Sequence, residues 1–133
     1  MGVWRLGYLD GVLSTAEKIA AQDPDPADLV ALVGTELTGL LGLDGCRYAP
    51  VAPHLRTVIQ PDGHVRSGER LLDVDRHGLP TEEEILLPVR SAGHSVGGFV
   101  LTSASRVRYP TPEQLRVAVL LADQVGTVLS HRR

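Results

Sequence analysis

The chain has 133 residues, of which 43% are hydrophobic and 22% are charged, so it fits one globular domain and is not a disordered chain. Its formal net charge of −3 argues against a surface built to neutralise nucleic-acid phosphates. The single cysteine, Cys46, excludes an internal disulfide, a cysteine-based zinc site and a dithiol redox pair.

No targeting signal or membrane segment is recognisable. The first residues contain no long apolar stretch, and the longest run without Asp, Glu, Lys or Arg, residues 91–105, is too short and too polar to cross a bilayer. We therefore expect a cytoplasmic location and no membrane insertion by this segment. Arginine far outnumbers lysine, a usage typical of a high-GC bacterium.

Residues 4–22 contain no proline and show helical spacing. One apolar group recurs at intervals that place it on one helix face: Leu6, Leu9, Leu13, Ala16 and Ala20. A second apolar group lies off that face: Trp4, Tyr8, Val12 and Ile19. A helix that is apolar on more than one side usually has more than one partner. The run Asp23-Pro24-Asp25-Pro26 then ends the helix.

A second helix is predicted to begin at Asp25, which can cap it, with Pro26 at the first helical position. Its apolar positions recur at helical spacing: Leu29, Val33, Leu37 and Leu40. The glycine-containing run 42–45 predicts its end.

Short strands are predicted next, over about 46–51, 56–60 and 64–66. The run 60–64, Gln-Pro-Asp-Gly-His, is a turn, because proline presets the first turn position and glycine accepts a positive φ. The region 67–82 is less regular and predicts at most one further short strand before a loop.

The apolar runs 85–89 and 96–102 are separated by the turn residues 91–94 and predict a β-hairpin. Within it, Pro88 must occupy a position that needs no N–H donor, and Gly97-Gly98 indicates a bulge or a close backbone approach.

Thr111-Pro112-Glu113-Gln114 is a capping box that predicts the start of the last helix. Two helix faces are again apolar. The first consists of Leu115, Ala118, Val119, Ala122, Val125 and Leu129, and the second of Val117, Leu121 and Val128. The element order predicts one α+β domain, with an antiparallel sheet of five to six strands and the N- and C-terminal helices packed on one face.

The predicted hairpin 85–101, ILLPVRSAGHSVGGFVL, resembles the penultimate hairpin of GAF domains, which has an apolar strand ending in Pro-Leu or Pro-Val, a glycine turn and a Val-Gly strand. Residues 109–116 resemble the start of that family's last helix, and 120–126 its Leu-x-x-Leu-Ala-x-Gln-Ala-Ala pattern. Residues 29–33 and 46–48 match more loosely. The resemblance covers about residues 15–130.

The resemblance implies a GAF-like (profilin-like) sensory or regulatory module that dimerises through its terminal helices. We expect a single domain over 1–133, with a dimerising helix in 1–22 and a core in 23–133. The expected homodimer interface consists of Leu9, Leu13, Leu121, Val125 and Val128. The two-faced apolar pattern of both terminal helices agrees with this, because a terminal helix can bury only one face in its own domain.

Several functional motifs of GAF domains are absent. The region between the first strand and Glu83 is shorter than the lid-building region of ligand-binding members, the Asn-Lys-Phe-Asp-Glu motif for cyclic nucleotides is missing, and Cys46 does not match the bilin-attachment cysteine. One cysteine also excludes the methionine-sulfoxide-reductase branch. These departures favour dimerisation and signal relay over tight ligand sensing.

A charged cluster lies where GAF domains close their pocket: Arg66, Arg70, Asp73, Asp75, Arg76 and His77. Such a set could hold a small anionic or zwitterionic ligand, and we take Arg66, Arg70, Asp75, Arg76 and His77 as the candidate ligand-binding residues. The alternative is an exposed loop of mixed charge.

No catalytic residue, metal site or cofactor is predicted. Cys46 reads as a buried small residue, because no His or Lys is adjacent to lower the pKa of its thiol. The five histidines are scattered without metal-ligand spacing, and the run 82–84, Glu-Glu-Glu, reads as a solvated strand start. The arginines at 106, 108, 132 and 133 form no basic stripe that would indicate nucleic-acid binding.

The sequence thus favours a non-catalytic, GAF-like sensory or regulatory domain that dimerises, with a small-molecule ligand and a signalling partner such as a sensor kinase left open. The alternative is a ligand-free structural dimerisation or scaffold domain of the roadblock or profilin-like class. An apolar cavity beside residues 64–79 would favour the first, and a filled interior the second.

Overall fold

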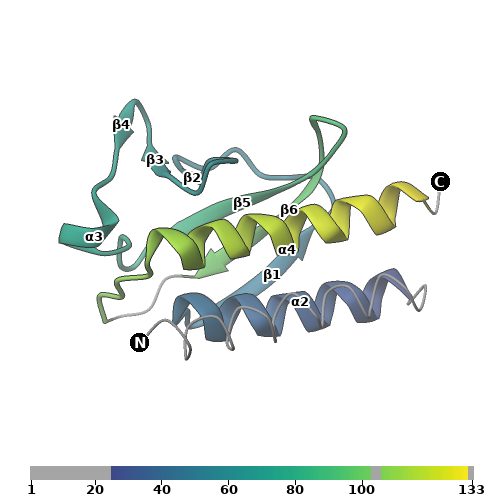
Figure 1. The fold of residues 1–133 in the computed structure, drawn as a ribbon, viewed down its shortest axis with the longest axis horizontal. Coiled ribbons are helices and arrows are strands. Elements are labelled where there is room, and N and C mark those ends of the chain that lie inside the picture. Colours follow the sequence, from purple (N-terminus) through teal and green to yellow (C-terminus); the bar gives the residue numbers. More distant parts are fainter. Residues whose placement is uncertain (1–24, 103–105, 132–133) are drawn as a thin grey trace.

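The computed structural model describes residues 25–102 and 106–131, so the helix predicted over 4–22 lies outside the described residues (Figure 1). The described chain forms an α+β fold with a helix at each end. Its elements are, in order, α2 (Pro26–Leu41), β1 (Gly45–Ala49), β2 (Thr57–Ile59), β3 (Val65–Ser67), β4 (Arg70–Leu71), α3 (Val74–His77), β5 (Glu84–Ser91), β6 (His94–Thr102) and α4 (Pro112–His131).

The strands form one six-stranded sheet in the order β1-β6-β5-β2-β3-β4. The prediction of a purely antiparallel sheet is wrong, because β2 runs parallel to β5, with Thr57 opposite Ile85 and Val58 opposite Leu86. Parallel neighbours need a long connection, and the excursion through β3, β4 and α3 supplies it. Strands β2, β3 and β4, with α3, are called the peripheral arm below.

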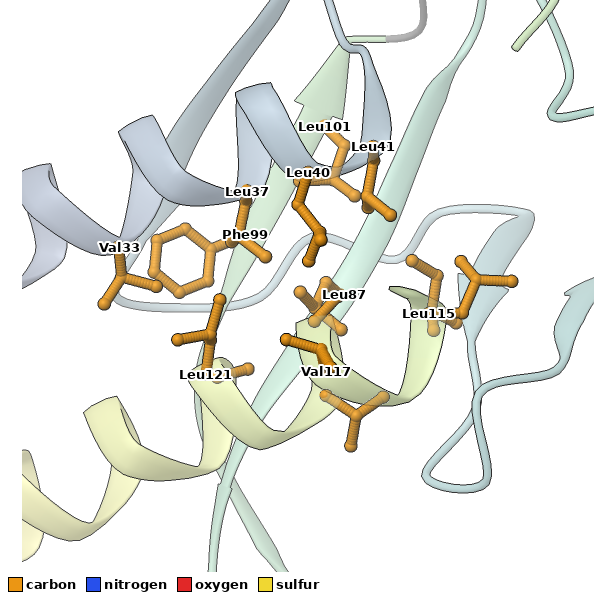
Figure 2. Close-up of a cluster of buried hydrophobic side chains, with 14 of the residues drawn as sticks. Val33, Leu37, Leu40, Leu41, Leu87, Phe99, Leu101, Leu115, Val117 and Leu121 are labelled. Atoms are coloured by element: carbon orange, nitrogen blue, oxygen red, sulfur yellow. The ribbon is translucent and has the colours of Figure 1, made fainter. Parts of the chain in front are cut away.

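Two helices cover one face of the sheet. In Figure 1, α4 lies along β5 and beside α2, and both pairs make contacts. The interior is aliphatic as predicted, with Phe99 as its largest fully buried side chain. Figure 2 shows side chains from α2, the sheet and α4 meeting there, namely Val33, Leu37, Leu40, Leu41, Leu87, Phe99, Leu101, Leu115, Val117 and Leu121.

Both predicted helix starts are confirmed at the level of atoms. The Asp25 carboxylate accepts a hydrogen bond from the backbone N of Ala27 at 2.9 Å, and Gly42 ends α2 in the left-handed conformation. At α4, the Thr111 hydroxyl accepts from the backbone N of Gln114 at 3.1 Å. The Gln114 side chain in turn accepts from the backbone N of Thr111 at 2.8 Å. This reciprocal pair is a complete capping box.

The hairpin β5–β6 is also confirmed, with a tighter turn than predicted. Strand β5 ends at Ser91 and β6 begins at His94, so only Ala92 and Gly93 form the turn, and both have a positive φ. That geometry is the one that suits the twist of two antiparallel strands. A register shift follows Val89, and β2 pairs with β5 only before Pro88, so β5 has a neighbouring strand on one side only at Pro88.

Helix α4 approaches β5 closely at Gly126. A Cβ atom placed there would lie 2.0 Å from the carbonyl oxygen of Arg90, a distance that requires the helix to move. Gly126 therefore sets the spacing between helix and sheet. Within the described residues, no helix is long and apolar enough to cross a bilayer.

We expect Gly126→Ala to lower the free energy of unfolding by about 1–3 kcal/mol, although alanine is the better helix former, because the added methyl overpacks the α4–β5 contact. Gly39→Ala is the matched control, since a Cβ at this position in α2 meets no atom within 4 Å. It should stabilise by about 0.5–1 kcal/mol. Urea unfolding measures both, and equal effects of the two substitutions would contradict the close approach.

Candidate functional site

A groove of about 320 Å³ lies where the peripheral arm meets the first turns of α4. Figure 1 shows α3 beside that end of α4. We call this hollow the arm groove. Its lining residues are Asp62, Gly63, His64, Leu71, Leu72, Asp73, Val74, Asp75, Pro112, Leu115 and Arg116.

One wall of the arm groove is the turn between β2 and β3. The backbone N of Gly63 donates to the carbonyl of Gln60 at 2.9 Å, and Gly63 has a φ of 91°, so this position favours glycine. A Cβ at Gly63 would lie 3.1 Å from Cγ of Arg116, which shows how closely the turn approaches α4. The turn predicted from the Pro-Asp-Gly run thus becomes part of the groove.

The turn also holds a local pair of the Asp62 carboxylate and the His64 imidazole. Asp62 accepts a hydrogen bond from the backbone N of His64 at 3.0 Å, and its other oxygen lies 2.9 Å from Nδ1 of His64. These contacts, the backbone bond first, lower the pKa of the Asp62 carboxyl below its ordinary value.

The peripheral arm contributes two more carboxylates to the lining. Asp73 caps the short helix α3, accepting from the backbone N of Arg76 at 3.3 Å, and Asp75 is exposed on its first turn. Besides these three carboxylates, the lining holds the guanidinium of Arg116 and the imidazole of His64, which pairs with Asp62. The charged rim is therefore mainly negative, and its apolar part consists of Leu71, Leu72, Val74, Pro112 and Leu115.

The structure divides the predicted ligand-binding cluster. Asp75 lines the arm groove, whereas Arg70 and His77 line a second hollow of about 430 Å³ on the other side of Leu71–Asp73. Arg66 and Arg76 are exposed and line neither hollow. The five residues do not converge because they are spread over β3, β4 and the single turn of α3. Neighbouring side chains on such short elements point in different directions.

Three lining residues were missed by sequence reasoning: Asp62, His64 and Arg116. Asp62 and His64 belong to the recognised turn, and its Asp-Gly-His run is the signal that could have found them. Arg116 lies far along the chain, on α4, and only the tertiary fold brings it to the turn.

A third hollow, of about 330 Å³, lies between α2 and β1 and contains the only cysteine. Burial raises the pKa of the Cys46 thiol to about 11. A thiol with this pKa is almost entirely protonated at neutral pH, so Cys46 is poorly suited to act as a nucleophile.

Glu83, within the run 82–84, holds a structural position. Glu83 accepts a hydrogen bond at 2.6 Å from the hydroxyl of Thr57, the one buried polar residue of the described core. Within residues 25–102 and 106–131, no group of His, Cys, Asp and Glu side chains could hold a metal ion.

Of the predicted dimer-interface residues, two lie outside the described chain and three are buried in α4. Leu9 and Leu13 lie outside the described residues. Leu121, Val125 and Val128 are 2%, 0% and 7% exposed in the single chain, where they pack in its core. A dimer contact made by α4 would therefore have to use other side chains of that helix, such as Leu120, which is 47% exposed.

We expect His64→Ala to raise the pKa of Asp62 only part of the way back to its ordinary value, because the backbone N–H of residue 64 remains as a donor. Carbon-detected NMR titration of the Asp62 carboxyl measures the change. His77→Ala, which removes another exposed histidine, should leave it unaltered. An unchanged Asp62 titration in His64→Ala would show that the Asp62–His64 pair does not form in solution.

Comparison of the chain with family models, with curated proteins and with solved structures found no match. The resemblance to GAF domains therefore stays a prediction that rests on the motifs of the hairpin and the last helix. What can be said of function comes from the groove itself.

Proposed function

We propose that this chain is a non-catalytic, GAF-like regulatory domain that binds a small molecule in the arm groove and relays binding to α4. The observation that carries the proposal is the composition of the groove walls. One wall belongs to the peripheral arm and the other to the first turns of α4, through Pro112, Leu115 and Arg116. A ligand in this groove touches both.

The lining favours a ligand with an amine. Three carboxylates and one guanidinium give the rim an excess of negative charge, which disfavours the purely anionic ligand considered from the sequence. A zwitterion of the amino-acid kind fits better, because its amine can meet Asp73 and Asp75 while its carboxylate meets Arg116. Leu71, Leu72 and Leu115 offer contacts to an aliphatic part.

Relay to α4 follows from the contacts of that helix. α4 packs on β5 at Gly126 and beside α2, so a change at its first turn is carried along a rigid element. A ligand that binds one position of α4 more tightly than another shifts the population of the two. A signalling partner, such as a sensor kinase, would read the position of the helix.

The ligand-free scaffold alternative rests on the prediction of a homodimer. The groove beside residues 64–79 is the feature that favours the binding domain over it. Dimerisation is compatible with both functions.

The ligand proposal is tested by calorimetry with a panel of amino acids, aliphatic amines and carboxylic acids. We expect binding by amine-bearing members and none by the simple acids. Asp75→Asn should weaken binding about tenfold, the value of one charge-assisted hydrogen bond of about 1.4 kcal/mol. Glu69→Gln removes the same charge from an exposed residue outside the groove and should leave affinity unchanged. Binding of acids alone, or equal losses in the two variants, would contradict the proposal.

The dimer is tested separately, by sedimentation velocity. If α4 contributes its exposed face to a homodimer, Leu120→Glu should convert the dimer to a monomer without lowering the unfolding midpoint, because Leu120 is half exposed in the single chain. Val51→Glu replaces an apolar side chain that is 86% exposed and lies outside α4 with the same charge, and serves as the control. A wild-type protein that is monomeric at tens of micromolar would refute dimerisation itself.

A further inference from the structure

The third hollow, between α2 and β1, has the character of a docking groove for an apolar helix. It is lined by Val30, Ala31, Gly34, Thr35, Thr38, Cys46, Tyr48 and Phe99, none of which is charged. We call it the helix groove. It is separate from the arm groove, and no residue lines both.

The polar groups of the helix groove are already satisfied within the chain. The hydroxyls of Thr35 and Thr38 donate back to the carbonyls of Ala31 and Gly34, at 3.1 and 2.8 Å. The Tyr48 hydroxyl donates to the carbonyl of Val96 at 3.4 Å. The groove therefore has little need of a polar ligand, and its occupant should be apolar.

The outer face of α2 continues this uncharged surface. Its exposed residues are Ala27, Asp28, Ala31, Leu32, Thr35 and Gly39, of which only Asp28, in the first turn, carries a charge. Glu36, one turn after Leu32, is half-buried and is the other acidic residue on this side of the helix. A solvent-facing helix surface normally carries more charge than that of α2. The groove also borders β1, the terminal strand of the sheet order, and helices commonly cover such edges.

We propose that residues 4–22 of the same chain dock in the helix groove as a helix antiparallel to α2, with Leu9 and Leu13 inserted. The described chain begins at Asp25, the N-cap of α2, directly after the segment 1–24. Only Asp23 and Pro24 separate the predicted helix 4–22 from that cap, and a connection this short joins antiparallel neighbours. The predicted helix would be about 28 Å long and α2, with 16 residues, about 24 Å, so the two lengths match.

The antiparallel arrangement pairs large side chains with small ones. A turn at Asp23-Pro24 brings together residues whose numbers add to about 48. Leu13 then faces Gly34 and Thr35, and Leu9 faces Thr38, which all line the groove. Leu9 and Leu13 thus meet positions where α2 carries small side chains, as close helix packing requires.

This docking leaves the second apolar group of the segment uncovered by α2, namely Trp4, Tyr8, Val12 and Ile19. With Leu9 and Leu13 placed against α2 in the same chain, the second group remains for another contact. Leu9 and Leu13 are then not available to a homodimer unless the segment leaves the groove.

Cys46, the only cysteine of the chain, lines the groove and reports on its occupant. A Cβ at Gly34 would lie 3.8 Å from Sγ of Cys46, so a side chain at position 13 that faces Gly34 comes close to this thiol. We would introduce Leu13→Cys in the full chain and treat the dilute protein with a short bis-maleimide at about pH 7.5, where maleimides are stable and the small thiolate fraction reacts. Ser14→Cys, on the polar face of the segment, is the matched control.

We expect Leu13→Cys to form an intramolecular cross-link with Cys46, seen as a monomer of altered mobility and confirmed by peptide mass, at a rate about tenfold above Ser14→Cys. A cross-linked dimer would overturn the proposal and assign the groove to a second copy. Equal yields from the two variants would overturn it as well.

A second measurement protects the test against a variant that misfolds. Leu13→Ala should raise the alkylation rate of the native Cys46 about tenfold, a loss of about 1.4 kcal/mol of docking free energy, whereas Ser14→Ala should leave the rate as in the unmodified chain. An unchanged rate in Leu13→Ala would overturn the proposal. Neither measurement depends on the arm groove, so a failure here leaves the proposed function intact.

Discussion

The close contact between α4 and β5 at Gly126 is the constraint on which the rest of the fold depends. The absence of a side chain lets the helix backbone approach the carbonyl of Arg90, and a methyl group would force the two apart. Because α4 lies this close to β5, its apolar faces contact both the sheet and α2. Leu121 lies with Leu37 and Phe99 in the core (Figure 2). The same placement brings Leu115 and Arg116 to the peripheral arm.

The two grooves divide the surface by chemistry. The arm groove is lined by carboxylates, a guanidinium and apolar side chains, a composition suited to a small charged molecule. The helix groove carries no charge, and its hydroxyls are bonded to the chain's own carbonyls, so it suits a helix. If both proposals hold, the ligand contacts α4 and the N-terminal segment contacts α2. These two helices lie in one layer and contact each other.

Local signals predicted the elements well. The capping residues Asp25 and Thr111 and the terminating Gly42 act through their own backbone neighbours, so their effect can be read from adjacent residues. The placement of the candidate site residues could not be read from local signals. Asp75 lies in the arm groove, but Arg70 and His77 face another hollow, because the directions of side chains on a two-residue strand and a single helical turn depend on how that segment leaves the sheet.

The sequence by itself determined the α+β class, the aliphatic core, the helix caps and the hairpin, since each follows from periodicity or from contacts between residues close in the chain. Only the tertiary structure decided the strand order, the parallel pairing of β2 with β5, and the meeting of Asp62, Asp75 and Arg116. It also decided that Val125 is a core residue. These outcomes depend on contacts between residues far apart in the sequence, whose relative energies no local pattern records.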